Sequence, residues 1–306
     1  MKLLHGVTTA MVTPFTKEGD IDFQAVEQLT NFLVSKGVQA LFPLGTTGEM
    51  LRLSIEERKA VAETVVRAAA GRVTVYIHAG ATTTKDTIAL ARHAHAVGAD
   101  GIGVVTPIFS VVNDREMEQF YVEVASSVPA EFPVYLYNIP QCSANDLSVE
   151  VVQRVATQCR NVVGLKYSYP DFTRTGAYLA LNDFSVVQGA DHLFVPALAM
   201  GCSGTVSGVS SVFPEPFVEV YRHMQSGDLD EARRWQHIAT RYCNILQNGR
   251  NMAYFKAALN WRGLTGGSVR SPQLDLAQAD VELLHQSLRE MERETSLGLL
   301  NPVSNS

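Results

Sequence analysis

One lysine in this sequence is of a type and position that could act on carbonyl compounds. Lys166 lies in the apolar run Val162–Tyr167, where burying its ammonium group is costly unless the group is paired or neutralised. The same desolvation makes a lysine amine a nucleophile toward a carbonyl carbon. A lysine at the end of a strand can equally extend its ammonium group into solvent, so this residue alone leaves both interpretations open.

A hydroxyl-rich turn and a phenol could complete such a site. The turn Gly45–Gly48 (GTTG) can hold a carboxylate or phosphate among backbone N–H donors, although it could also be an ordinary connection between a strand and a helix. Tyr137 ends the apolar run Val134–Tyr137, and its phenol is either a proton relay or a hydrogen-bonded core group. Together with Lys166, these groups predict an enzyme that binds a 2-oxo acid and forms an imine with it.

A scaffold that gathers the ends of several strands is needed to bring these groups together. The sequence contains eight short apolar runs typical of buried strands, which are Val7–Phe15, Ala40–Leu44, Val73–Ala79, Gly101–Thr106, Val134–Tyr137, Val162–Tyr167, Ser185–Gly189 and Gly204–Ser207. Helical patterns lie between them, and the clearest begins at Ser54 with a capping box to Glu57. This alternation predicts an α/β fold, a closed (β/α)8 TIM barrel with its site on the loops after the strands. An open doubly wound sheet is the alternative, but the chain lacks a nucleotide-type glycine loop.

We expect the barrel to occupy residues 1–214 and a C-terminal helical extension to occupy residues 215–306. The extension is predicted from four helical patterns, which are Glu215–Gln225, Leu229–Gln247, Met252–Trp261 and Leu276–Glu294. The segment from Ser296 to Ser306 contains polar residues, glycine and proline, which predicts a mobile tail.

The composition argues against several classes of protein. The chain has 306 residues, 46% hydrophobic and 18% charged, which does not fit a disordered protein. Its net charge of -6 provides no basic field for nucleic acid or an anionic membrane, and no apolar run approaches the roughly 20 residues that a membrane helix needs. The four cysteines form no CxxC pair, and the N-terminus lacks the apolar region of a signal peptide. We therefore expect a cytoplasmic protein with a small-molecule substrate.

Short motifs spread over most of the chain carry a family resemblance. They are Gly6–Ala10 with Thr13–Phe15, GTTGE at Gly45–Glu49, Thr106-Pro107, YNIP at Tyr137–Pro140, GLK at Gly164–Lys166, and Gly204–Ser207. Their combination resembles the dihydrodipicolinate synthase / N-acetylneuraminate lyase family of pyruvate-dependent class I aldolases. The resemblance implies a TIM barrel with a C-terminal helical extension, assembled as a homotetramer or homodimer. It also implies that no metal or organic cofactor is needed, because an iminium on the lysine polarises the substrate.

The resemblance further implies roles for individual residues. Three positions match the family's catalytic groups, which are Lys166 for the Schiff base, Tyr137 for the proton relay and Thr46 for the relay hydroxyl. Four others match its pyruvate-binding groups, which are Gly45, Thr47, Gly48 and Val206.

Two positions depart from the family pattern and bear on the substrate. Cys142 stands where dihydrodipicolinate synthases carry an arginine that grips the carboxylate of the aldehyde, and a thiol cannot replace a guanidinium. Phe109 stands where the family has a tyrosine that reaches in from the neighbouring subunit. We therefore expect a 2-keto-3-deoxy sugar acid or an N-acetylneuraminate-like substrate, with Asp191 and His192 as candidate contacts. These two residues can equally be an ordinary hydrogen-bonded loop pair.

Several alternatives remain open at this point. The chain could be a dihydrodipicolinate synthase that condenses pyruvate with aspartate semialdehyde, or a non-catalytic homologue that binds a 2-oxo acid. The retained Lys166, Tyr137 and Thr46 favour catalysis. His93 and His95 resemble the HxH of metal-dependent hydrolases, but residues two apart on a predicted helix do not share a face.

Overall fold

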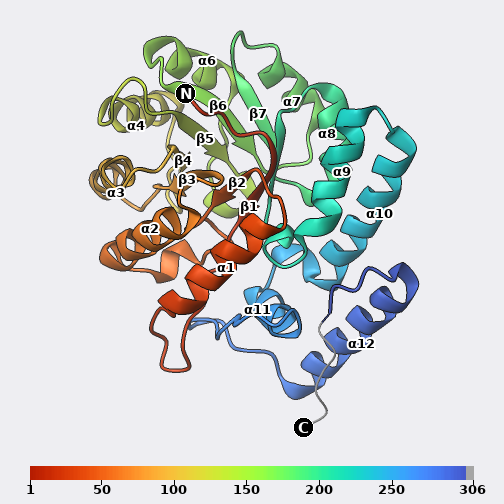
Figure 1. The fold of residues 1–306 in the computed structure, drawn as a ribbon. Helices are drawn as coiled ribbons and strands as arrows, with labels where there is room; N and C mark the ends of the chain where they lie inside the picture. Colours follow the sequence, from red (N-terminus) through yellow and green to blue (C-terminus); the bar gives the residue numbers. More distant parts are fainter. Residues whose placement is uncertain (301–306) are drawn as a thin grey trace.

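Eight parallel strands hydrogen-bond in chain order and close through a pairing of the first strand with the last (Figure 1). The computed structural model describes residues 1–300. The strands are β1 Gly6–Ala10, β2 Ala40–Phe42, β3 Thr74–His78, β4 Gly101–Val105, β5 Val134–Asn138, β6 Val162–Tyr167, β7 Ser185–Gln188 and β8 Gly204–Ser207. The predicted TIM barrel is confirmed.

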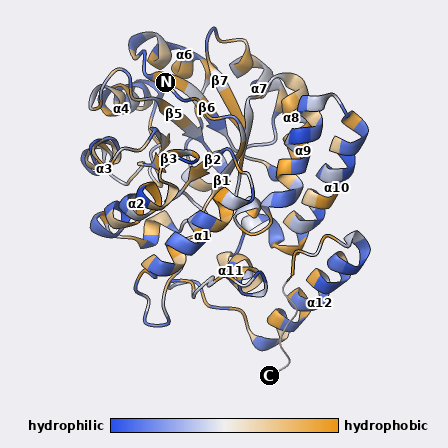
Figure 2. Cartoon of the chain, viewed as in Figure 1, coloured by the Kyte–Doolittle hydropathy of each residue, from blue (hydrophilic) through white to orange (hydrophobic). Residues whose placement is uncertain are grey.

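A layer of helices surrounds the strands, and their apolar faces pack inward (Figure 2). The helices are α1 Phe23–Ser35, α2 Ile55–Ala69, α3 Thr84–Ala96, α4 Asp114–Ser126, α6 Val149–Gln158, α7 Phe172–Leu179 and α8 Phe194–Met200. A single turn, α5 Pro140–Ser143, follows β5. The predicted capping box is present, because Ser54 accepts from the N–H of Glu57 and Glu57 accepts from the N–H of Ser54.

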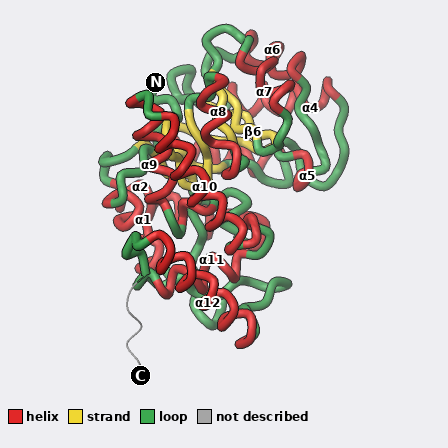
Figure 3. The backbone as a smooth tube through the Cα atoms, turned by 90° about the vertical axis from the view of Figure 1, so that its right-hand side faces the viewer, coloured by secondary structure: helices red, strands yellow, loops and turns green. Residues whose placement is uncertain are grey.

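The predicted helical extension follows the barrel and lies to one side of the strands (Figure 3). The helices that follow β8 are α9 Pro214–Ser226, α10 Leu229–Ile245, α11 Met252–Trp261 and α12 Gln278–Thr295. α9 contacts both β1 and α10 and so joins the barrel to the extension. The boundary at residue 214 stays a prediction, and the last residues of the predicted mobile tail, 301–306, lie outside the described residues.

Aromatic rings fill the inside of the barrel where neighbouring strands carry glycine. Phe42 and Tyr135 are fully buried in one cluster beneath the carboxyl ends of the strands. A Cβ atom on Gly103 would lie 2.3 Å from the Phe42 ring, and one on Gly164 would lie 2.5 Å from the Tyr135 ring. These two glycines therefore provide the space for the rings, which form the floor beneath the mouth of the barrel.

The first strand is shorter than predicted. β1 ends at Ala10 instead of Phe15, because the following residues leave the sheet. Thr13 in this segment donates to the carbonyl oxygen of Gly48, and Phe15 forms a bridge with Ser268 of the extension. The segment therefore supports the turn after β2 and connects it to the extension. Within residues 1–300, no helix has the length and apolar character needed to cross a membrane.

Candidate active site

Lys166 and Tyr137 lie side by side at the mouth of the barrel. β5 and β6 pair so that Tyr137 is directly opposite Lys166, which points both side chains to the same face. The Nζ atom of Lys166 lies 3.9 Å from the centre of the Tyr137 ring and 4.9 Å from that of Phe42. Lys166 is only 4% exposed and forms no ion pair with any residue in the described part of the chain. The arrangement presents a shielded amine that can approach a small carbonyl compound.

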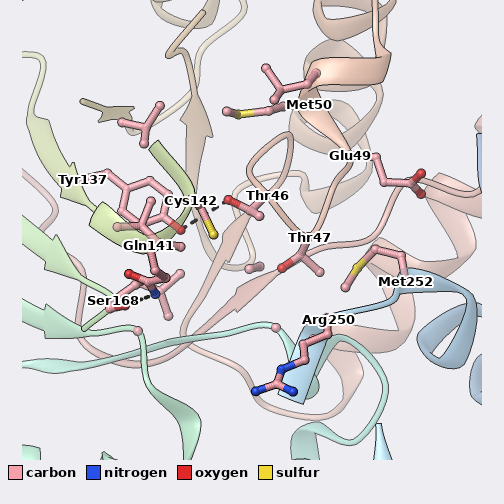
Figure 4. A pocket seen from close by; sticks show the side chains of 18 of the residues that line it. Thr46, Thr47, Glu49, Met50, Tyr137, Gln141, Cys142, Ser168, Arg250 and Met252 are labelled. Carbon is pink, nitrogen blue, oxygen red and sulfur yellow. Dashed lines mark hydrogen bonds between the residues drawn. The ribbon is translucent and has the colours of Figure 1, made fainter. Parts of the chain in front are cut away.

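The Tyr137 ring is held in place on two sides. Phe42 and His78 each meet it edge to face, with ring centres 6.5 Å and 5.9 Å away. Its phenol oxygen lies 3.5 Å from the hydroxyl oxygen of Thr46, and a dashed line marks this contact in Figure 4. The structure thus brings together the two residues predicted to form the proton relay.

The turn after β2 presents free backbone donors. The N–H of Glu49 bonds to the carbonyl of Thr46. The N–H groups of Thr46 and Thr47 have no acceptor among residues 1–300. A Cβ atom on Gly48 would lie 2.9 Å from the backbone nitrogen of Leu44, so this position requires glycine. Two hydroxyls and two unpaired amides form a concave surface that suits a carboxylate.

A buried ion pair fixes this turn to the extension. Glu49 follows the turn with φ 57°, and its carboxylate lies 2.6 Å from the Nζ atom of Lys256 on α11. Both side chains are buried, and Arg52 approaches the same carboxylate at 3.3 Å. Burial lowers the pKa of Lys256, although Glu49 opposes that effect. Lys256 also donates to the carbonyl of Ser268, so the extension restrains the turn after β2.

His78 supports both the turn and Tyr137 from below. Its Nε2 atom accepts from the N–H of Val105 at 3.3 Å, which leaves the proton on Nδ1 to be donated to the carbonyl of Leu44 at 3.1 Å. Burial holds the pKa of His78 well below its usual value, and the charges of Arg58 and Lys166 add to this effect. The imidazole is therefore neutral and acts as a structural support. No sequence motif connects His78 to the site, because its contacts with Leu44, Val105 and Tyr137 arise only from the fold.

These groups surround one cavity of about 800 Å³ at the carboxyl ends of the strands. The predicted site residues that line it are Lys166, Tyr137, Thr46, Thr47, Val206, Asp191 and Cys142. Gly45 and Gly48 do not line the cavity but shape the turn that carries the two threonines. His192 is exposed and is not among the lining residues.

Asp191 therefore enters the cavity without its predicted partner. Its Oδ2 atom accepts from the N–H of Val209 at 3.2 Å, whereas Oδ1 has no hydrogen-bond partner among the described residues. Burial raises the pKa of Asp191 to about 6, although the Val209 bond and Lys166 oppose this. The side chain is thus available to a substrate hydroxyl.

The cavity also contains residues that sequence reasoning missed. Gln141 donates to the carbonyl of Ser168 at 2.7 Å, and Arg250 and Met252 reach the cavity from the extension (Figure 4). The break between α10 and α11 is visible in the sequence as Gln247-Asn248-Gly249. No sequence pattern shows that this break borders the same cavity as Lys166, because contacts across the fold determine its position.

The chain is similar to known proteins over most of its length. The model of the Dihydrodipicolinate synthetase family matches residues 3–291. An uncharacterized DapA-like lyase of Halobacterium salinarum is 36% identical over 289 residues, covering 94% of each chain. A 4-hydroxy-tetrahydrodipicolinate synthase of Aquifex aeolicus is 32% identical over 301 residues, covering 98% of this chain and all of the relative.

Two solved structures show the same fold. The crystal structure of dihydrodipicolinate synthase from Aquifex aeolicus has a TM-score of 0.89 and 32% identity, and it covers 97% of this chain and 100% of its own. A prophage protein of the dihydrodipicolinic acid synthase family from E. coli K12, solved in complex with pyruvate, has a TM-score of 0.89 and 28% identity, covering 95% of this chain and 99% of its own. The chain therefore belongs to the dihydrodipicolinate synthetase family, whose members are lyases and synthases that act with pyruvate.

Proposed function

We propose that this protein is a Schiff-base aldolase that joins pyruvate to an aldehyde or releases it in the reverse direction. The proposed substrate is a 2-keto-3-deoxy sugar acid or an N-acetylneuraminate-like compound. The observation that carries the proposal is the buried amine of Lys166 beside Tyr137, facing the same cavity as the amide-lined turn at Thr46 and Thr47.

The first half of the proposed reaction forms an iminium. Thr47 and the free N–H groups of the turn bind the carboxylate of pyruvate and place its C2 carbon next to Lys166. The Nζ atom attacks C2 to give a carbinolamine. Tyr137, in contact with Thr46, donates a proton to the hydroxyl group, which leaves as water when the C=N bond forms.

The second half makes or breaks a carbon–carbon bond. The iminium withdraws electrons, so C3 loses a proton and becomes the nucleophilic carbon of an enamine. That carbon attacks the aldehyde carbon, and the aldehyde oxygen takes up a proton. Water then hydrolyses the new iminium, which releases the product and restores the amine. We propose that neither a metal nor an organic cofactor is needed, since the iminium itself is the electron sink.

The test is covalent trapping with sodium borohydride in the presence of pyruvate. We expect a reduced adduct on the peptide that contains Lys166 and none in a Lys166→Arg variant, whose guanidinium does not form this imine. The far-ultraviolet circular dichroism of the variant shows whether it is folded. A wild-type protein that gives no adduct, or a variant that gives the same adduct on another lysine, would contradict the proposal.

A 4-hydroxy-tetrahydrodipicolinate synthase is the second candidate. The names of several relatives favour it, but Cys142 lines the cavity where the resemblance places the arginine for aspartate semialdehyde. Rapid condensation of pyruvate with aspartate semialdehyde would favour this candidate. A non-catalytic 2-oxo acid binder is less favoured, because binding alone requires neither a buried lysine nor a relay pair.

We also propose that the protein acts in the cytoplasm as a homotetramer or homodimer. In the loop after β4, Phe109 is 94% exposed and Val111 is 79% exposed, although both are apolar. Ile108, next to Phe109, lines the cavity. Contact with a second subunit would cover these side chains beside the site.

A further inference from the structure

We propose that Arg250 determines substrate specificity by binding an anionic group, a carboxylate or phosphate, at the end of the aldehyde remote from the reacting carbon. The inference rests on the proposed aldolase reaction and restricts its substrate to compounds whose aldehyde half carries a second anionic group. Arg250 belongs to the extension, more than eighty residues after Lys166 in the sequence, yet both residues line the same cavity.

The backbone around Arg250 is held in a defined position. Gln247, Asn248 and Gly249 all have positive φ angles, of 53°, 52° and 75°. The N–H of Arg250 donates to the carbonyl of Gln247, and the next residue, Asn251, caps α11 by accepting from the N–H of Ala253. The side chain therefore leaves a fixed turn. Figure 4 shows it beside the pocket, on the same side as Met252.

Apart from Lys166, which serves the reaction itself, Arg250 is the cavity cation without an acidic partner among residues 1–300. The charged residues that line the cavity are Glu49, Arg52, Lys166, Asp191 and Arg250. Glu49 is already paired with Lys256 and Arg52, and Asp191 accepts from the backbone of Val209. Across residues 1–300, the guanidinium of Arg250 takes part in no ion pair and donates no hydrogen bond. All its donors are therefore free for a ligand.

The chemistry of this group specifies the kind of ligand. Guanidinium presents a planar fork of N–H donors that matches the two oxygens of a carboxylate or phosphate. The turn at Thr46 and Thr47 is suited to the carboxylate of pyruvate and Lys166 to its carbonyl, so neither serves a second anion. Cys142 offers only a partly buried thiol whose pKa is raised by that burial. Arg250 is thus the residue in the cavity that can bind the far end of an anionic aldehyde.

Matched pairs of aldehydes test this inference. Each pair differs in an anionic group: succinic semialdehyde against butanal, and glyceraldehyde 3-phosphate against glyceraldehyde. For Arg250→Gln we expect kcat/KM with pyruvate to fall by at least about tenfold for the anionic members and to change less than about twofold for the neutral ones. A loss confined to succinic semialdehyde assigns a carboxylate, and one confined to glyceraldehyde 3-phosphate assigns a phosphate.

Controls separate this inference from the proposed reaction. Arg289→Gln replaces an exposed arginine on α12 outside the cavity and should leave every rate unchanged. Borohydride trapping of pyruvate on Lys166 should stay the same in Arg250→Gln, so a wild type that traps no pyruvate marks a failure of the proposed function instead. Where an aldehyde does not react with pyruvate, kcat/KM cannot be compared. In that case we compare how strongly the aldehyde inhibits exchange of the C3 protons of pyruvate in the wild type and in the variant. Equal losses for charged and neutral members, or no wild-type preference for the charged ones, would overturn the inference.

Discussion

Tyr137 can be tested apart from the packing around it. Tyr137→Phe retains the ring that contacts Lys166, Phe42 and His78 but removes the oxygen that lies near Thr46. We expect iminium formation to slow by about 100-fold, because an aligned proton donor contributes roughly 10²–10⁴-fold to such steps. The rate of pyruvate C3 proton exchange measures this.

Tyr121→Phe provides the matched control for that variant. Tyr121 is equally buried, but its hydroxyl donates to the carbonyl of Val104 and does not line the cavity. The control should exchange pyruvate protons at the wild-type rate. If both variants slow to the same extent, the role of Tyr137 is structural.

Asp191 makes stability depend on pH in a defined direction. Its pKa is raised to about 6 from an ordinary value of 3.8, so folding favours the protonated carboxyl. The stabilisation that the protonated Asp191 gives to the folded state is complete at pH values below the ordinary pKa of 3.8. It is lost as the pH rises through about 6. Asp191→Asn removes this ionisation. We expect its stability relative to wild type to increase by about 1–3 kcal/mol between pH 4 and pH 8.

Urea unfolding of both proteins across that pH range measures the effect. The raised pKa is refuted by a difference in free energy of unfolding that stays constant with pH, or that moves the other way. Asp275→Asn serves as the control, since that carboxylate accepts a hydrogen bond from the N–H of Val269 at an exposed position.

At the scale of the elements, the Glu49–Lys256 pair connects the turn after β2 to α11. Lys256→Met would leave the buried Glu49 carboxylate with Arg52 as its one remaining ion-pair partner among residues 1–300. We expect a loss of about 3–5 kcal/mol in the free energy of unfolding, because one buried charge loses its partner. We also expect a higher pyruvate concentration for half-maximal trapping, because the turn is less restrained.

The double variant Glu49→Gln/Lys256→Met separates charge from packing. Because neither position then carries a charge, most of the lost stability should return. Denaturant unfolding reports stability, and borohydride trapping over a range of pyruvate concentrations reports binding. A double variant as unstable as Lys256→Met would show that packing, and not the unpaired carboxylate, causes the loss.

The sequence predicts elements well where local patterns determine them. The apolar runs identify every strand of the barrel, and Ser54 and Glu57 mark the start of α2. β1 and β2 end earlier than the apolar runs that predict them. The residues that follow support or form the turn after β2, so they are buried without belonging to a strand. Apolar character alone does not separate a strand from a buried loop.

Local sequence patterns predict only part of the candidate site. Lys166 and Tyr137 fall at strand ends, which a barrel necessarily brings together. His192 was expected in the cavity with Asp191 but turns out to be exposed and outside its lining. Arg250 follows a helix break that sequence alone cannot place, since the packing of the extension on the barrel positions it.

At the scale of the whole molecule, the exposed apolar loop after β4 predicts self-association. Phe109 has φ 73° and presents its ring to solvent, and Val111 lies two residues further along. We expect wild-type protein to have the mass of two or four chains by light scattering. Phe109→Asp should shift this distribution toward smaller species, because a carboxylate is costly to bury in an apolar contact.

A change in the exposed Leu283 of α12 controls for surface hydrophobicity in general. Leu283→Asp should leave the mass unchanged, since this side chain lies far along the chain from the β4 loop and outside the cavity. A monomeric wild type, or a Phe109→Asp variant with unaltered mass, would contradict assembly through this loop.

The buried contact between Glu49 and Lys256 has a consequence for how such enzymes could diversify. Residues 247–256 contain both Arg250 and the lysine that anchors this segment to the barrel. A chimaera that exchanges only residues 247–256 between relatives would also carry the lysine that pairs with Glu49. It would leave Lys166, Tyr137 and the turn after β2 unchanged. Under the proposed role of Arg250, replacing this one segment would alter the choice of aldehyde and leave the residues proposed to act on pyruvate unchanged.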